Sequence, residues 1–137
     1  ILDSVLPKPR SWPSLPALVP SLLEAFEQGL DSWAWRTACE ILDDESTSSD
    51  EETRLFVSRR PDFTGNDRVD ALVAAFAEHV CVERGIAAPP WAWEPRVCTP
   101  WWFVAGLSAF EGRAMHESPP SFASRGIFVT RRDLMKA

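Results

Sequence analysis

The chain of 137 residues contains no tyrosine, and its three cysteines, Cys39, Cys81 and Cys98, lie far apart in the sequence. No CxxC pair occurs, so the sequence supports neither a zinc knuckle nor a thioredoxin-like redox motif. An odd number of widely spaced cysteines favours reduced thiols, and we therefore expect a cytoplasmic protein. Residues 59–129 also lack a phosphate-binding loop, a metal-ligand cluster and a nucleophile–base pair. These absences favour a binding module over an active site.

Long apolar runs and basic residues are scarce as well. No uninterrupted apolar stretch approaches the roughly 18 residues that span a bilayer, and no charged segment precedes a signal-like stretch at the start. There are 14 Lys and Arg residues against 20 Asp and Glu, which gives a formal net charge of −6. This balance argues against direct binding to nucleic acid or a membrane, and favours a basic protein surface as partner.

Proline and tryptophan, in contrast, are abundant, with twelve Pro, seven Trp and eight Phe. The length fits one domain with a sizeable core, and 45% apolar and 25% charged residues are ordinary for a globular chain. Pro7, Pro9 and Pro13 predict that residues 1–13 form an extended arm or linker. Residues 14–137 are then expected to form a helical binding domain.

The clearest helical pattern covers residues 67–84, with Asn66 or Asp67 as its N-terminal cap and Gly85 after its end. Its apolar residues recur at helical spacing and predict a single buried stripe. The residues of this stripe are Val69, Leu72, Val73, Phe76, Ala77, Val80 and Cys81.

Further helices are expected over shorter and less regular patterns. They cover about residues 16–28, 32–43, 51–59 and 102 or 106 to 116, with short turns at 91–93, 118–124 and after Thr130. Strand signals are few. The sequence therefore predicts a mainly α fold, a small single-domain helical structure with Pro-rich irregular segments.

His79 and Glu83 lie one helical turn apart, a spacing that suits an acid–base or metal pair. Catalytic zinc sites usually need three protein ligands, and His116 is the only other histidine. A structural or surface role for His79 is therefore the better interpretation. Cys81 is predicted to point inward, which disfavours a thiol–imidazole pair. We expect no catalytic, metal-binding or cofactor-binding residues, and hence no enzyme.

Acidic residues are concentrated at residues 40–52, where seven acids occur without a base. Calcium loops need a glycine at a sharp turn, and this stretch has none. The simplest interpretation is a solvated loop, and contact with a basic partner is the functional alternative. The candidate contact residues are Asp43, Asp44, Glu45, Asp50, Glu51 and Glu52.

Tryptophans cluster at residues 91–102, and the four members are Trp91, Trp93, Trp101 and Trp102. Stacking on a nucleobase would need a basic groove around the rings. Only Arg96 is close in sequence, and Glu94 stands nearby. Core packing and a protein-binding patch are therefore the two interpretations that stay open.

Three motifs follow one another in the C-terminal half: TGNDRVDALVAAFAEHVCVERGIAAPPWAW, PWWFVAGLSAF and ESPPSFASRGIFVTRRDL. Their order over about residues 59–135 resembles a C-terminal domain of actinobacterial proteins. Many members of that family carry an N-terminal helix-turn-helix and are regulators or antitoxins, often beside nucleotidyltransferase-like toxins. Residues 1–58 of this chain show no helix-turn-helix pattern.

The resemblance implies an antitoxin-like or regulatory protein that binds and neutralises a cognate protein, with a nucleotidyltransferase-type toxin carrying a basic cleft as the expected partner. The alternative is a protein-interaction domain of a transcriptional regulator without a toxin. Arg125, in the locally basic C-terminal quarter, joins the candidate contact residues as part of an ion-pairing surface. The sequence does not specify the oligomeric state.

Overall fold

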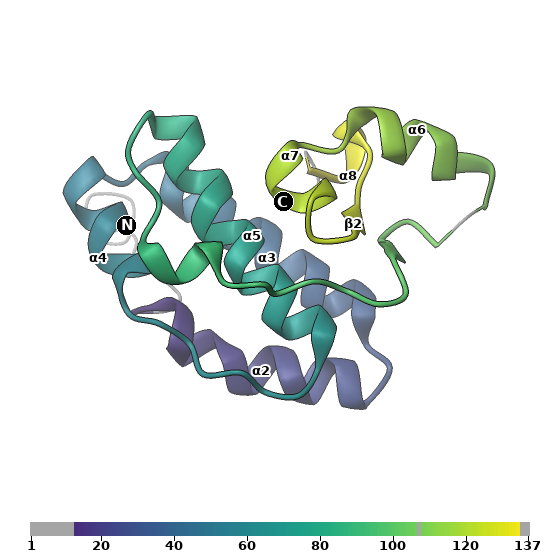
Figure 1. Cartoon of the computed structure of the whole chain (residues 1–137), viewed down its shortest axis with the longest axis horizontal. Coiled ribbons are helices and arrows are strands. Elements are labelled where there is room, and N and C mark those ends of the chain that lie inside the picture. The colour runs from purple at the N-terminus through teal and green to yellow at the C-terminus, as the bar shows by residue number, and fades with distance from the viewer. Residues whose placement is uncertain (1–12, 107, 135–137) are drawn as a thin grey trace, which may run out of the picture.

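The computed structural model describes residues 13–106 and 108–134, so the predicted arm lies outside it except for Pro13. The fold is mainly helical, as predicted (Figure 1). Its helices are α2 (Leu15–Glu27), α3 (Asp31–Ser46), α4 (Asp50–Ser58), α5 (Asp67–Arg84), η1 (Pro90–Trp93), η2 (Ser108–Phe110), α6 (Glu111–Glu117), α7 (Pro120–Ala123) and α8 (Arg131–Leu134). The described residues also form two short strands, β1 (Trp102–Phe103) and β2 (Ile127–Phe128).

Local capping explains where α5 begins and ends. The Asn66 side chain accepts hydrogen bonds from the backbone N–H groups of Arg68 and Val69. Gly85 ends the helix with a positive φ of 67°, and the following N–H of Ile86 bonds back to the carbonyl of Cys81. Both ends agree with the sequence prediction.

Helix α4 begins with a capping box, one residue before the start of the helix predicted over residues 51–59. Ser49 is the cap, because its hydroxyl accepts from the N–H of Glu52. The Glu52 carboxylate in turn accepts from the N–H of Ser49 at 2.9 Å. Asp50 is the first helical residue.

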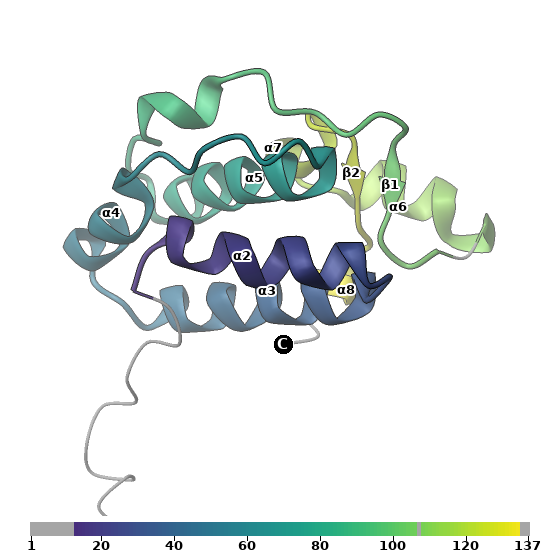
Figure 2. The same cartoon turned by 90° about the horizontal axis from the view of Figure 1, so that it is seen from below.

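Helix α5 lies at the centre of the molecule. Helices α2, α3, α4 and α7 and the turn η1 all pack against it (Figures 1 and 2). Every predicted stripe residue is buried, which confirms the predicted face. The prediction of a single stripe is nevertheless incomplete, because all of residues 69–77 are buried. Ala71, Ala74 and Ala75 cover the other sides, as expected for a helix enclosed by its neighbours.

Helices α2 and α3 form a hairpin beneath α5 in Figure 2. They bury Leu18, Leu22, Trp35 and Ala38. The predicted second helix ended at about residue 43, whereas α3 continues to Ser46. The acidic stretch is therefore not a loop, because most of it belongs to the end of α3 and the start of α4.

Of the two predicted starts for the next helix, residue 102 is wrong, whereas residue 106 lies close to the start of η2 at Ser108. Trp102 and Phe103 instead pair in parallel with Ile127 and Phe128. The N–H of Trp102 donates to the carbonyl of Gly126 at 2.8 Å. This pairing joins residues 25 positions apart, so no local pattern indicates it. Helical structure starts only at η2 and α6.

Candidate partner-binding surface and cleft

The four clustered tryptophans divide into two buried and two exposed residues. Trp91 and Trp102 belong to the core, whereas Trp93 is 64% and Trp101 56% exposed. The indole N–H of Trp91 donates to the carbonyl of Val57 at 2.8 Å. The structure therefore corrects the inclusion of Trp91 and Trp102 among the contact residues, since their rings are not accessible to a partner.

The segment that carries Trp93 and Trp101 is anchored by the buried Arg96. The Arg96 guanidinium lies 4.2 Å from the ring centre of Phe63 and 5.2 Å from that of Trp91. It donates to the carbonyl of Pro61 at 2.5 Å and to the carboxylate of Glu94 at 3.0 Å. One side chain thus fixes the middle of the segment against the loop before α5.

Glu94 completes this anchor on the solvent side. Its carboxylate accepts two hydrogen bonds from Nε of Arg60, at 2.9 and 3.1 Å. These bonds, together with those from Arg96, lower the pKa of Glu94, although desolvation acts in the opposite direction. The carboxylate therefore stays ionised and holds both arginines.

Four exposed apolar side chains lie in this anchored segment or in the loop that it contacts: Phe63, Trp93, Val97 and Trp101. Phe63 and Val97 are not among the contact residues predicted from the sequence. A large apolar residue in the polar loop between Pro61 and Gly65 was the available signal for Phe63.

Trp101 is held in place by the strand that follows α7. Its ring centre lies 5.0 Å from that of Phe128. A Cβ atom on Gly126 would come within 3.1 Å of Cδ1 of Trp101 and 2.9 Å of the carbonyl oxygen of Cys98. The side-chain-free Gly126 therefore lets the exposed indole pack closely on the backbone.

Three of the acidic candidate residues bind other residues of the chain. Glu45 is buried and accepts a hydrogen bond from the Thr53 hydroxyl at 2.7 Å. Asp50 forms an ion pair with Arg84 at 3.0 Å, and Glu52 belongs to the capping box. Glu45 is therefore removed from the contact residues as a correction, because its carboxylate lies inside the fold.

Of the remaining acids, Asp43 and Glu51 are exposed, and Asp44 is half-buried at the end of α3. Glu51 lies 3.9 Å from Arg54, an ion pair between two exposed side chains. Such pairs are weak. Asp50 and Glu52 are exposed as well, so Glu45 is the one acidic candidate that the fold buries.

Arg125 is also internal, which corrects its assignment to an ion-pairing surface. Its guanidinium donates to Glu78 on α5 at 2.5 Å, and to the carbonyls of Ser121 and Ala92, both at 2.6 Å. The side chain therefore ties together α5, α7 and η1. All these partners lie within the chain.

A cleft of about 630 Å³ opens between α3, the C-terminal end of α5, the turn before α7, and α8. Its apolar lining comprises Leu42, Val80, Pro119 and Leu134. Its charged and polar lining comprises Glu45, Ser46, His79, Glu83, Arg84, Glu117 and Arg131.

His79 lies at the inner edge of this cleft. Its Nδ1 atom is 3.4 Å from the hydroxyl of Ser121, and its ring centre lies 5.2 Å from that of Phe122. Burial lowers the pKa of His79, and this outweighs the nearby Glu83 and Glu78 carboxylates, which act to raise it. The imidazole is therefore neutral at pH 7.

Ser121, His79 and Glu83 form a hydroxyl–imidazole–carboxylate series, but its geometry differs from that of a hydrolytic triad. The hydroxyl belongs to a buried residue and does not line the cleft, and the His79–Glu83 separation is 3.9 Å. A nucleophile must reach its substrate. Across the part of the chain that the structure describes, no group of three or more His, Cys, Asp or Glu is placed to hold a metal ion.

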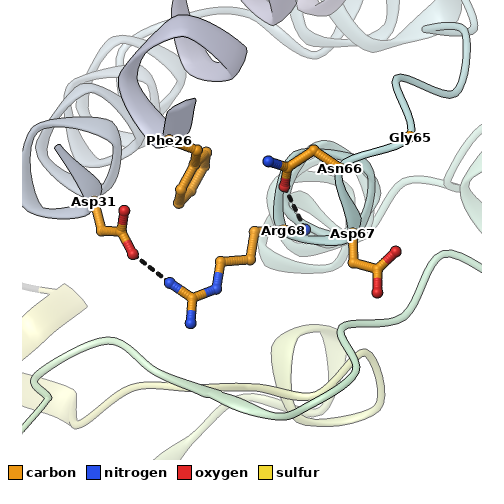
Figure 3. A pocket seen from close by; sticks show the side chains of 6 residues that line it. All are labelled: Phe26, Asp31, Gly65, Asn66, Asp67 and Arg68. Atoms are coloured by element: carbon orange, nitrogen blue, oxygen red, sulfur yellow. Dashed lines mark hydrogen bonds and ion pairs between the residues drawn. The ribbon is translucent and has the colours of Figure 1, made fainter. Parts of the chain in front are cut away.

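A second pocket of about 450 Å³ lies at the N-terminal end of α5 (Figure 3). Arg68 points across it to form an ion pair with Asp31, and its guanidinium lies 5.1 Å from the ring centre of Trp102. The side-chain oxygen of Asn66 is occupied by the helix cap. Arg68, Asp31 and Asn66 thus already have partners in the chain.

All three cysteines are buried and free. Burial raises the pKa of Cys39 to about 11 and that of Cys98 to about 12, and it also raises the pKa of Cys81. The thiols are therefore protonated at neutral pH and are poor nucleophiles.

In comparisons with known proteins, no family model matches the chain, and no match is found among curated proteins or solved structures. Among the described residues, no helix is long and apolar enough to cross a membrane.

Proposed function

We propose that this chain is a non-catalytic protein-binding domain that contacts its partner through Trp93 and Trp101. The observation that carries the proposal is that both indoles are more than half exposed on a segment anchored by buried side chains. Tryptophan is enriched among the residues that dominate binding energy at interfaces. A fixed backbone lowers the conformational entropy that is lost on binding.

Charge supports a basic partner. The formal net charge of −6 and the surface acids Asp43, Asp44 and Glu51 favour the approach of a positively charged protein. With the sequence resemblance, this leads to an antitoxin-like role in the cytoplasm, in which the domain covers the basic cleft of a nucleotidyltransferase-type toxin. Inhibition would be steric and would need no chemistry from this chain.

The test is capture of the native partner followed by quantitative binding. Tagged wild-type protein and the double variant Trp93→Ala/Trp101→Ala are used to recover proteins from the native host, which are identified by mass spectrometry. The matched control is Trp33→Ala, a 44% exposed tryptophan on α3. The recovered partner is then purified and titrated calorimetrically against all three proteins.

We expect the double variant to lose about 2 kcal/mol or more of binding free energy, whereas Trp33→Ala binds like wild type. Equal affinity of the double variant and wild type would show that Trp93 and Trp101 do not contact the partner. A transcription factor in place of a toxin as the recovered partner would favour the regulator alternative.

A further inference from the structure

We propose that the cleft between α3, α5 and α8 is a second contact site, which takes up a lysine or arginine side chain of the partner. The identity of that partner rests on the proposed function. The preference of the cleft for a cationic side chain is independent of the proposed function, because it follows from the residues that line the cleft.

The apolar lining suits the aliphatic part of such a side chain. Leu42, Val80, Pro119 and Leu134 come from four different parts of the chain and meet in the cleft. Its volume of about 630 Å³ is within the usual range for ligand sites and leaves room for neighbouring residues of a peptide. Lys and Arg commonly pack their methylene groups on apolar surface and keep the charged end in water.

The carboxylates of the cleft suit the charged end. The Glu83 side chain is 69% exposed and lies 3.9 Å from Nε2 of His79. His79 is neutral, because burial lowers its pKa, so it does not offset the charge of Glu83. Glu117 accepts the N–H of Arg131 at 2.8 Å through its Oε1 atom, and it remains a second negative charge in the cleft.

The basic residues of the lining compensate only part of this charge. Arg84 is committed to Asp50 and to the backbone carbonyls of Glu45 and Ser48. Arg131 is exposed at the start of α8. Glu83 and Glu117 therefore face a single exposed guanidinium, and a cationic ligand is favoured over an anionic one.

The test uses the tripeptide Lys-Leu-Lys, blocked at both ends, titrated into isotope-labelled protein and followed by NMR. The matched probe is the same peptide with both lysines acetylated, which removes the charge and keeps the length. We expect the largest shifts at Val80, Glu83, Glu117 and Leu134, and weaker binding of the acetylated peptide.

Substitutions of charged residues in the cleft test whether its negative charge binds the peptide. Glu83→Gln and Glu117→Gln should each weaken binding by roughly two- to fivefold, and Arg131→Gln should strengthen it. Glu51→Gln, a remote exposed carboxylate on α4, should leave binding unchanged. Glu83 and Glu117 are not buried, so the spectra of these variants should match that of the wild-type fold.

Equal binding of the acetylated peptide, or shifts that avoid the cleft, would overturn the assignment. If the peptide does not bind the cleft but Trp93 and Trp101 still contribute to partner binding, only the cleft proposal is rejected. If the cleft binds the peptide in a charge-dependent way but the Trp93→Ala/Trp101→Ala variant binds the partner as wild type does, only the tryptophan interface is rejected.

Discussion

The guanidinium of Arg125 lies 2.5 Å from the carboxylate of Glu78 in the interior of the fold. The same guanidinium donates to two backbone carbonyls, on η1 and on α7. A buried charge without a partner is costly. The contact thus ties α7 and η1 to a carboxylate of α5.

Arg125→Met should lower the free energy of unfolding by about 3–5 kcal/mol, because it leaves Glu78 without its partner and two carbonyls without a donor. Denaturant unfolding provides the measurement. Arg132→Met, which changes an exposed arginine, is the matched control. If both variants unfold at the same denaturant concentration, the buried pair does not hold the segments together.

Phe76→Ala should cost about 3–5 kcal/mol of stability, because the ring is buried and meets Phe122 edge to face at 5.8 Å. Leu55→Ala, at a 65% exposed position, should change stability by no more than about 0.5 kcal/mol. The same unfolding experiment compares them. Similar losses for the two variants would contradict the placement of Phe76 in the core.

Acid should destabilise the fold through His79. The pKa of His79 in the folded chain lies below the ordinary value of 6.5. As the pH falls, the imidazole is therefore protonated in the unfolded chain at a higher pH than in the folded chain. The corresponding stability is present above pH 6.5 and is lost as the pH falls below that value. Unfolding measured from pH 8 to pH 5 should show a smaller loss for His79→Gln. Exposed His116→Gln is the control, and equal slopes in wild type and His79→Gln would contradict the prediction.

Gly126→Ala should destabilise more than Gly29→Ala. Both glycines have positive φ angles, 77° and 73°, which cost an alanine about 1–3 kcal/mol. Only at Gly126 would the added Cβ also meet the carbonyl oxygen of Cys98, at 2.9 Å. Thermal unfolding of the two variants separates the close contact from the backbone cost, and equal losses would mean that the contact relaxes freely.

Replacing Asp43, Asp44 and Glu51 by neutral residues should slow association with the partner and reduce its dependence on salt. Exposed charges act mainly on the association rate and are screened by ions. Stopped-flow mixing at several salt concentrations measures both effects. Glu24→Gln, on the exposed side of α2, is the control, and unchanged kinetics for the triple variant would leave these acids without a steering role.

Features of the fold set by local chemistry could be predicted from the sequence. Asn66 and Gly85 delimit α5 because a side-chain cap and a positive φ are properties of single residues. The spacing of Phe76 and Val80 identifies one buried face. The enclosure of the other faces depends on how α2, α4 and η1 pack against α5, and the residue spacing within α5 does not indicate that packing.

The candidate site was predictable only in part for the same reason. The sequence leaves core packing and a protein-binding patch open for the clustered tryptophans. Trp102 enters the core beside its strand partner Ile127, and Trp91 does so through its bond to Val57, and both partners are more than 20 residues away in the chain. Likewise, the partners of Arg125 and Glu45 come from other helices. No sequence pattern distinguishes these buried charges from surface ones.

The alanines of α5 have a consequence for how this fold can diverge. Ala71, Ala74 and Ala75 are fully buried in the central helix, against which α2, α3, α4, α7 and η1 pack. A larger side chain at one of these positions would push a whole segment outward. We therefore expect that homologues keep very small residues there, or change a facing residue at the same time. Their divergence should be greatest on the solvent-facing sides of α2 and α3.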